Sequence, residues 1–310
     1  MELLNINELH INFSTNGGQV QVLSGFCLDI QKGNSICLVG ESGCGKTIVA
    51  LSIMRLLPEN AQISGKIRFK DRDLLTLGKE EMRRIRGHEI SMIFEQPSSC
   101  LNPVFTVGDQ IAEAVRANEE CEKKEARESA IALMKLTGIP SPEKRFGQYP
   151  HEFSGGMLQR AMISIAMASK PALLIADEPT TSLDVSVQAQ MIELIKDLIA
   201  KFDMSLLLIT HDLGVAAELC RDVVVMYAGE IVENGGLNEV FDHPRHPYTQ
   251  ALLKAISDGE LRPIRGTVPE LTHLPEGCRF HPRCPYAKEQ CCYLKPDLIN
   301  GVRCHLWKKC

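Results

Sequence analysis

The chain has 310 residues, 44% hydrophobic and 24% charged, which is enough for one large domain or two smaller ones with a sizeable core. Its formal net charge of −5 argues against nucleic acid as the main partner, because phosphate binding needs a basic face. The first residues lack the basic and apolar regions of a signal peptide, and no apolar run reaches the roughly 20 residues of a membrane span, so we expect a soluble, cytoplasmic protein.

The first part of the chain predicts two kinds of strand. Residues 2–69 contain segments that alternate apolar and polar side chains, such as LLNINELHINF and SGKIRF, and this alternation is typical of an antiparallel sheet. Within it, SICLVG at residues 35–40 is a short apolar run that ends in a glycine-rich turn. We expect a buried strand there, followed by a helix over residues 46–57.

The rest of the chain alternates helical and strand patterns. Residues 105–149 are rich in Ala, Glu, Lys and Arg and predict a helical insertion. Further apolar runs predict buried strands within residues 171–179 and 205–212, and a strand, a turn and a strand over residues 222–235. Buried strands separated by helices indicate an α/β fold with a parallel sheet covered on both faces. After Asn234 the content of Pro, His and Cys rises, and we expect a small appendage.

The sequence GESGCGKT at residues 40–47 matches the pattern G-x-x-x-x-G-K-S/T of a phosphate-binding loop. It follows an expected strand and opens an expected helix, and this context favours nucleotide binding over a glycine-rich turn that happens to contain a lysine. Lys46 would reach the β- and γ-phosphates of ATP, and the Thr47 hydroxyl would hold Mg²⁺. The residues expected to bind the nucleotide are Gly40, Ser42, Gly43, Cys44, Gly45, Lys46 and Thr47.

A second motif, ALLIADE, ends an apolar run with Asp177 and Glu178. A carboxylate at the end of a buried strand suits Mg²⁺, held directly or through water, and we assign that role to Asp177. Glu178 would lie beside the attacking water as general base. An acidic surface pair after a strand is the alternative, and the phosphate-binding loop in the same chain argues against it.

Between these motifs lies FSGGMLQR, and with GESGCGKT and IADEPT it resembles the ATP-binding cassette (ABC) family. The resemblance implies that Ser154, Gly155 and Gly156, at the start of a helix, bind the γ-phosphate of an ATP held by the opposite subunit. Ser154 would also cap that helix. Asp184 in TTSLD is similar to a residue of the family's D-loop, and His211 in LLLITHDL is similar to its switch histidine, which contacts the γ-phosphate.

Longer segments are similar to the ATPases of peptide and nickel importers. They are SSCLNP, YPHEFSGGMLQRAMISIAMA, DEPTTSLDVSVQAQ and HPRHPYTQALLKAI. The resemblance covers nearly the whole chain and implies an ABC ATPase domain over residues 1–234, with an antiparallel β subdomain, a RecA-like parallel-sheet core and a helical subdomain at about residues 105–155. Residues 235–310 would form the cysteine-rich C-terminal extension of this subfamily.

Six of the twelve cysteines lie between residue 278 and the C-terminus. In the resembled subfamily the extension can carry an iron–sulfur cluster, and the matching positions here are Cys278, Cys284, Cys291 and Cys304. A 4Fe–4S cluster takes four thiolates, whereas structural zinc sites usually show close pairs of cysteines. The spacings of five, six and twelve intervening residues favour the cluster, with zinc and buried free thiols as alternatives. Cys292 could replace Cys291 as a ligand.

The loop after the apolar run ISMIF departs from the family pattern. The family places Gln, Glu and Pro here, and its Gln contacts Mg²⁺ and the attacking water. This chain reads FEQP, so Glu95 occupies the Gln position. Either the Glu95 carboxylate binds Mg²⁺ or Gln96 takes the role after a shift of the loop. Phe13 is the candidate for stacking on the adenine ring.

The resemblance implies that the chain binds and hydrolyses ATP as a subunit of an importer, with dipeptides or oligopeptides ranked first as cargo and nickel second. Its partners would be two membrane-spanning permease subunits, a second ABC ATPase subunit in a homodimer or heterodimer, and an extracytoplasmic substrate-binding protein. It would lie at the cytoplasmic face of the cell membrane, with the permeases docked around residues 95–106 and the helical insertion. The alternatives are a non-transport ABC ATPase and a cluster-bearing redox or metal sensor with a degenerate cassette.

Overall fold

The structure, a computed structural model, describes residues 1–15, 18–118, 120–181, 183–257 and 264–307. The chain divides into two compact units. The first comprises Met1–Gln31, Ser35–Thr76 and Ile209–Cys310, and the second comprises Lys32–Asn34 and Leu77–Leu208. None of the described helices is both long and apolar enough to cross a membrane.

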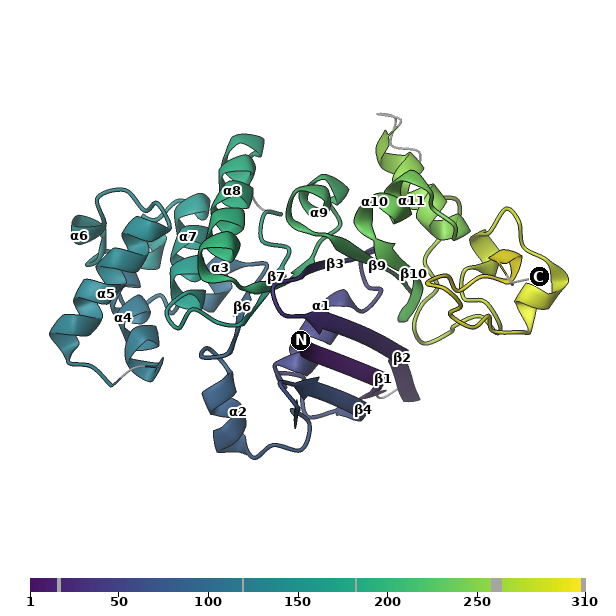
Figure 1. Cartoon of the computed structure of the whole chain (residues 1–310), viewed down its shortest axis with the longest axis horizontal. Coiled ribbons are helices and arrows are strands. Elements are labelled where there is room, and N and C mark those ends of the chain that lie inside the picture. The colour runs from purple at the N-terminus through teal and green to yellow at the C-terminus, as the bar shows by residue number, and fades with distance from the viewer. Residues whose placement is uncertain (16–17, 119, 182, 258–263, 308–310) are drawn as a thin grey trace. The chain divides into compact units, whose positions relative to one another are not determined.

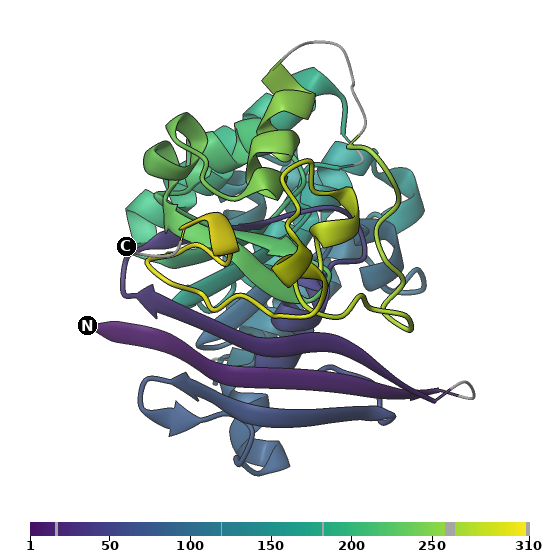
Figure 2. The ribbon, with the colours of Figure 1, turned by 90° about the vertical axis from the view of Figure 1, so that its right-hand side faces the viewer.

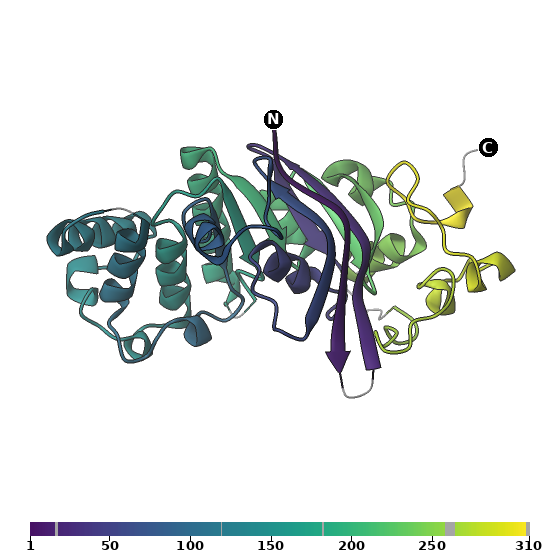
Figure 3. The same cartoon turned by 90° about the horizontal axis from the view of Figure 1, so that it is seen from below.

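The first unit contains the expected antiparallel sheet, with strands in the order β2-β1-β4-β5 (Figure 3). The strands are β1 (Glu2–Thr15), β2 (Gly18–Gln31), β4 (Ala61–Phe69) and β5 (Arg72–Asp73). On β1 the side chains of Leu4 and Ile6 are buried, and so are those of Leu9 and Ile11 beyond a shift in register. Glu8 takes a positive φ of 47° at this shift. The resulting bulge returns Leu9 and Ile11 to the buried face, which strict alternation would have turned to solvent.

The same unit holds a second group of strands in the order β10-β9-β3. They are β3 (Ser35–Val39), β9 (Asp222–Tyr227) and β10 (Glu230–Gly236). β3 runs parallel to β9 and is buried along its whole length, as its apolar sequence predicts. Ala228 and Gly229 join β9 to its antiparallel neighbour β10 with φ values of 45° and 83°, the backbone of a two-residue hairpin turn. The predicted strand, turn and strand is therefore confirmed.

Helix α1 (Lys46–Ile53) begins where the sequence predicts but ends before residue 57. Arg55 takes a positive φ of 49°, and the N–H of Leu56 donates to the carbonyl oxygen of Leu51 at 2.8 Å, which closes the helix. The predicted helix was therefore too long at its C-terminal end. The other helices of the first unit are α9 (Leu213–Leu219), α10 (Leu237–Asp242) and α11 (Pro247–Ser257).

The second unit contains three buried strands in the order β8-β7-β6. They are β6 (Ile90–Ile93), β7 (Leu173–Asp177) and β8 (Ser205–Ile209), and the predictions of strands in the last two places are confirmed. β6 and β7 run parallel. The helices are α2 (Lys79–Ile85), α3 (Pro97–Cys100), α4 (Val107–Asn118), α5 (Lys123–Leu136), α6 (Pro142–Arg145), α7 (Gly155–Ala166) and α8 (Val185–Phe202), with a 3₁₀ turn η1 (Pro150–Glu152).

The residues predicted to be helical contain α4, α5 and α6, and α4 and α5 pack with α7 (Figure 1). These helices share a core of their own that includes Val107, Ile111, Met134 and Phe146. Gly108 permits the close packing, because a Cβ atom there would lie 2.2 Å from the Phe146 ring. Apolar residues at helical spacing meet in this core, so tertiary packing stabilises helices of largely polar composition.

The C-terminal segment, residues 264–307, is irregular chain with three 3₁₀ turns, η2 (His281–Arg283), η3 (Glu289–Cys292) and η4 (His305–Trp307). It lies against β10 (Figure 2). There the N–H of Arg303 donates to the carbonyl oxygen of Val232, and the N–H of Asn234 donates to that of Gly301, both at 2.8 Å. The segment thus belongs to the first unit. The predicted boundary between an ATPase domain and an extension at residue 235 stays a prediction.

Candidate nucleotide site

The loop at residues 40–45 joins the end of β3 to the start of α1. Gly40, Gly43 and Gly45 have positive φ values of 153°, 80° and 104°, which other residues rarely adopt. A Cβ atom on Gly40 would lie only 2.3 Å from the carbonyl oxygen of Met226 in β9. Glycine is therefore required here both for the backbone conformation and for the close contact with β9. A loop of this kind directs backbone N–H groups towards phosphates.

Lys46 is buried, with 8% of its surface exposed. Its ammonium group donates to the carbonyl oxygens of Gly40 (2.7 Å) and Glu41 (3.2 Å) and lies 3.9 Å from the Cys44 sulfur. Phosphate oxygens are stronger acceptors for an ammonium group than neutral carbonyls, so Lys46 can exchange these contacts for a nucleotide. Burial raises the pKa of Cys44, whose thiol is therefore a neutral filler of the loop.

His211 lies in the same unit as the loop, two residues after the end of β8. The N–H of Thr210 donates to the carbonyl oxygen of Leu38 (3.2 Å), which places His211 beside the end of β3 where the loop begins. Asp212 fixes this turn, because its N–H donates to the Thr210 hydroxyl (3.0 Å) and its carboxylate accepts from the N–H of Gly214 (2.8 Å) at the start of α9. The imidazole of His211 is exposed on this anchored turn.

Asp177 and Glu178 lie at the end of β7 in the second unit. Asp177 is buried, with 3% of its surface exposed. Glu178 takes a positive φ of 48°, and its carboxylate accepts a hydrogen bond from the Thr181 hydroxyl at 2.9 Å. A left-handed conformation costs a residue other than glycine about 1–2 kcal/mol, and such strain concentrates at functional sites. The left-handed backbone and the bond from Thr181 together define where the Glu178 carboxylate lies.

Glu95 and Gln96 follow β6 in the same unit, and both side chains are exposed. β6 and β7 are parallel neighbours, with Ile93 opposite Ala176, so they end at the same edge. The structure thus brings Glu95 and Gln96 to the edge of the strands that carries the two acidic residues.

Ser154 and Asp184 cap two helices whose N-termini line one cavity of about 280 Å³. The Ser154 hydroxyl accepts from the N–H of Met157 (3.4 Å) in α7, and the Asp184 carboxylate accepts from the N–H of Val187 (3.0 Å) in α8. Hydrogen bonds from Val187 and from a neighbouring serine lower the pKa of Asp184. Gly155, Gly156 and Arg160 also line the cavity. Two helix N-termini and an arginine favour an anion there.

Cys278, Cys284, Cys291 and Cys304 line one small cavity of about 10 Å³ in the C-terminal segment, while Cys292 is exposed. Burial raises the pKa of Cys278 to about 11, so its thiol is protonated at neutral pH. Within the described residues, no three His, Cys, Asp or Glu side chains are arranged to hold a metal ion. The four expected ligands thus lie together, but the geometry does not support the predicted 4Fe–4S cluster.

Phe13 is half-buried near the end of β1, opposite Val20 on β2 and Ala61 on β4. Its assignment to the adenine ring stays a prediction. Two residues that the sequence did not single out contact the glycine loop, since Arg283 and Tyr248 both bind Glu41. They lie 242 and 207 positions from Glu41, and no local pattern marks them.

Known families match this chain in two places, residues 23–181 to the ABC transporter family and residues 232–291 to the C-terminal region of oligopeptide/dipeptide transporters. The chain is 48% identical over 291 residues to the dipeptide transport ATP-binding protein DppD of Bacillus subtilis, covering 92% of this chain and 87% of that protein. It is 46% identical over 319 residues to the oligopeptide transport ATP-binding protein AppD of the same organism, covering 99% and 97%. The chain belongs to the ABC transporter family.

This ABC ATPase shares its fold with solved structures. One is a dimeric ATP-binding cassette in a post-hydrolysis state bound to ADP and phosphate, with a TM-score of 0.68 and 22% identity over 76% of this chain and 98% of that one. The predicted α/β fold with antiparallel and parallel sheets is confirmed, and so is the prediction of an ATPase. ATP and Mg²⁺ are the substrate and metal of such an enzyme. The relatives do not favour a non-transport ATPase or a redox sensor, and they lend no support to nickel.

Proposed function

We propose that this ABC ATPase hydrolyses ATP to drive the import of dipeptides or oligopeptides, as the ATP-binding subunit of an importer at the cytoplasmic face of the cell membrane. The observation that carries the ATPase is the buried Lys46, which donates to two carbonyl oxygens of a loop whose three glycines all have positive φ values. Peptides are proposed as the cargo because the relatives similar over nearly the whole chain are named as dipeptide and oligopeptide transport proteins.

The glycine loop would bind the phosphates of ATP through its backbone N–H groups and Lys46. Buried as it is, Lys46 would bring a positive charge to the β- and γ-phosphates with little water to screen it. Thr47 and Asp177 would hold Mg²⁺, which supplies charge neutralisation to the phosphates. Phe13 would stack on the adenine ring.

Hydrolysis would use side chains that follow the strands β6, β7 and β8. Glu178, on its left-handed backbone, would orient the attacking water and accept its proton. His211, on the turn fixed by Asp212, would donate a hydrogen bond to the γ-phosphate. Glu95 or Gln96 would help to orient the water or to hold Mg²⁺.

A second ATPase subunit would complete the site. The cavity at Ser154, Gly155 and Gly156 would receive the γ-phosphate of the ATP that the partner binds, with Asp184 at its margin. Val185 supports this arrangement, since its apolar side chain is 85% exposed directly beside Asp184 and a subunit contact would cover it. ATP would favour the closed dimer and hydrolysis the open one, and this change would move the permeases.

The loop between α3 and α4 is the proposed docking surface for the permeases. Val104 and Phe105 are 70% and 54% exposed, which is unusual for adjacent large apolar side chains. Gln110 holds the loop in shape, because its amide accepts from the N–H of Asn102 (2.8 Å) and donates to the carbonyl oxygens of Asn102 (3.0 Å) and Phe105 (3.1 Å). A loop that presents two apolar side chains in a fixed shape suits the binding of an amphipathic helix from a membrane subunit.

The cysteine cavity remains the proposed place for a metal group in the C-terminal segment, an iron–sulfur cluster first and zinc second. A volume of about 10 Å³ is too small for a cluster in the described arrangement, so the thiols would have to separate and lose their protons. We therefore assign this group no part in ATP hydrolysis. Iron, sulfide and zinc analysis of protein purified without oxygen tests the assignment, and protein with none of the three elements would remove it.

Two measurements together test the proposed function. The purified chain should hydrolyse MgATP, and Lys46→Ala should abolish this activity while the protein stays folded. Cells without the chain should lose uptake of labelled dipeptides or oligopeptides, and the wild-type chain but not Lys46→Ala should restore it. ATPase activity in the purified protein combined with unchanged peptide uptake in those cells would refute peptide import and leave the enzyme activity standing.

A further inference from the structure

The C-terminal segment binds the glycine loop at Glu41, the second residue of GESGCGKT. Arg283 donates from Nη1 to Glu41 Oε2 at 2.7 Å and from Nη2 to Glu41 Oε1 at 3.0 Å. Only 4% of the Arg283 side chain and 26% of the Glu41 side chain are exposed. This two-pronged geometry fixes orientation as well as distance, and water screens a pair this buried only weakly.

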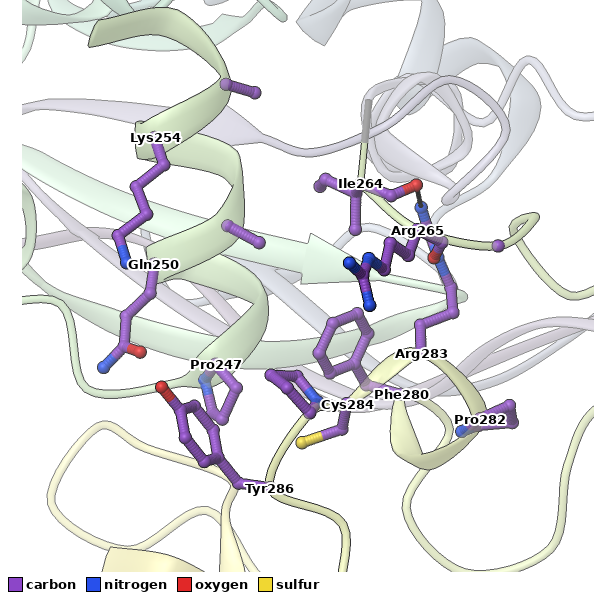
Figure 4. Close-up of a pocket in the computed structure, with 14 residues that line it drawn as sticks. Pro247, Gln250, Lys254, Ile264, Arg265, Phe280, Pro282, Arg283, Cys284 and Tyr286 are labelled. Carbon is purple, nitrogen blue, oxygen red and sulfur yellow. Dashed lines mark hydrogen bonds between the residues drawn. The ribbon is translucent and has the colours of Figure 1, made fainter. Parts of the chain in front are cut away.

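All five N–H donors of the Arg283 guanidinium have acceptors. Besides the two bonds to Glu41, Nε donates to the carbonyl oxygen of Arg265 (3.0 Å), Nη1 to the Tyr227 hydroxyl (3.3 Å) and Nη2 to the carbonyl oxygen of Ile264 (3.2 Å). Figure 4 shows Arg283 reaching Ile264 from the turn η2. A guanidinium held on every side cannot turn away from Glu41 without losing several bonds. Bonds to the C-terminal segment and to Tyr227 therefore hold the guanidinium in place in addition to its two bonds with the loop.

A second contact fixes the backbone of the same residue. The N–H of Glu41 donates to the hydroxyl of Tyr248 in α11 at 2.9 Å. Tyr248 is fully buried, and its ring lies 4.7 Å from the ring of Tyr227 and 5.5 Å from that of Phe280. Burial raises the pKa of Tyr248, so its hydroxyl stays neutral. Residues of β9, α11 and the C-terminal segment thus form one aromatic cluster behind the loop.

Because Glu41 is negatively charged, nucleotide binding depends on the positive charge of Arg283 beside it. A carboxylate in a phosphate-binding loop repels the phosphates unless a positive charge compensates it. Lys46 holds the Glu41 carbonyl oxygen at 3.2 Å, but this ammonium would move to the phosphates when ATP binds. Within the loop the N–H of Cys44 would still donate to the Glu41 carbonyl oxygen (3.3 Å), and from outside the loop Arg283 and Tyr248 would hold Glu41 in place.

We infer that Arg283 is a positioning residue for the glycine loop, and that the C-terminal segment thereby sets the affinity of this ABC ATPase for ATP. The inference rests on the proposed nucleotide site and adds a residue far from it in sequence. Arg283 touches neither the phosphates nor the attacking water in this scheme. It acts through Glu41, by holding its carboxylate and by compensating its negative charge.

The test compares Arg283→Gln with Arg303→Gln as a matched control. Arg303 also joins the C-terminal segment to the sheet, donating to the carbonyl oxygens of Ile231 (2.8 Å) and Pro296 (3.1 Å), but none of these bonds involves the loop. We expect Arg283→Gln to raise both the Kd for MgATP and the KM about tenfold. An increase of this size results if only about a tenth of the variant molecules hold the loop in the conformation that binds ATP. The kcat should stay within about twofold, because the hydrolytic groups are untouched. Arg303→Gln should leave Kd and KM at wild-type values.

Removing the opposing charge separates electrostatics from packing. In the double variant Glu41→Gln with Arg283→Gln, the unpaired carboxylate is gone, and most of the lost affinity should return. Arg283→Lys keeps the charge without the two-pronged bond and should give an intermediate Kd. If Arg283→Gln yields no folded protein, Tyr248→Phe removes the second contact, keeps the ring and should raise Kd severalfold.

Three results would overturn the inference. They are a wild-type Kd in the folded Arg283→Gln protein, an equal loss of affinity in Arg303→Gln, and a double variant no better than Arg283→Gln alone. A wild-type chain that neither binds nor hydrolyses MgATP is a different outcome, because it would refute the proposed function itself. The wild-type assay therefore comes first and keeps the two failures apart.

Discussion

Two glutamates contact Arg245, and replacing each by glutamine should have very different consequences. Glu233 in β10 has a side chain with no exposed surface, and its Oε1 accepts from the N–H (2.9 Å) and Nε (3.4 Å) of Arg245. Its Oε2 accepts from the N–H of His246 at 2.9 Å. Glu239 reaches the Arg245 guanidinium at 3.9 Å and is 62% exposed. Each replacement removes one negative charge near Arg245, so a difference in stability between the two variants reports the effect of burial.

The expected loss for Glu233→Gln follows from these bonds. A glutamine amide offers one acceptor oxygen, and its NH₂ group would face a backbone N–H, so one buried donor loses its partner at about 1–3 kcal/mol. Breaking the partly buried ion pair with Arg245 adds to this and brings the total to about 3 kcal/mol. Glu239→Gln should cost about 0.5 kcal/mol or less, because water already solvates that carboxylate.

The chain supplies its own probe for this measurement. Trp307 is the only tryptophan, and its Nε1 donates to the carbonyl oxygen of Arg245 at 2.6 Å. Urea unfolding followed by tryptophan fluorescence therefore reports on the region around Arg245. With a urea m-value of about 2–3 kcal/mol/M, Glu233→Gln should lower the midpoint by about 1 M and Glu239→Gln by much less. Equal shifts for the two variants would refute the reasoning, because burial would then have no weight.

Three further predictions concern the nucleotide site and its partners. Gly40→Ala should abolish MgATP binding, because the new Cβ atom would lie 2.3 Å from a carbonyl oxygen of β9. Gly236→Ala is the control: no atom lies within 4 Å of its new Cβ atom, and this variant should bind MgATP normally. Glu178→Gln should lower kcat by about 10²–10⁴-fold while the Kd for MgATP changes little. Val104→Asp with Phe105→Asp should abolish peptide uptake in cells and leave the ATPase activity of the isolated chain unchanged.

Each of these three has an outcome that contradicts it. Tight MgATP binding by Gly40→Ala would mean that the loop relaxes away from β9. A kcat within tenfold of wild type for Glu178→Gln would assign the general base to another residue. Normal peptide uptake with aspartates at positions 104 and 105 would place the permease contact elsewhere. Tyr293→Asp is the control for a charge placed on an exposed surface, because Tyr293 in the C-terminal segment is 65% exposed, and it should leave uptake unchanged.

The sequence by itself determined the parts of this protein that depend on neighbouring residues. The glycine loop is readable from eight consecutive residues, because each glycine serves a local backbone conformation. The buried strands β3, β7 and β8 are readable because each is a short apolar run. The end of α1 was missed, since the left-handed turn at Arg55 uses no glycine and so carries no local signal.

Only the tertiary structure decided which distant residues meet. Parallel pairing of β6 with β7 brought Glu95 and Gln96 to the edge that holds Asp177 and Glu178. The spacing of the cysteines pointed to a metal group, yet the fold places four of them around a cavity of about 10 Å³ without an arrangement that would hold an ion. The contact between Arg283 and Glu41 spans 242 positions, and nothing in the sequence around Arg283 indicates that it would bind Glu41. Such pairs form because the packing of the C-terminal segment excludes water, and that packing is a property of the whole unit and not of any short stretch of sequence.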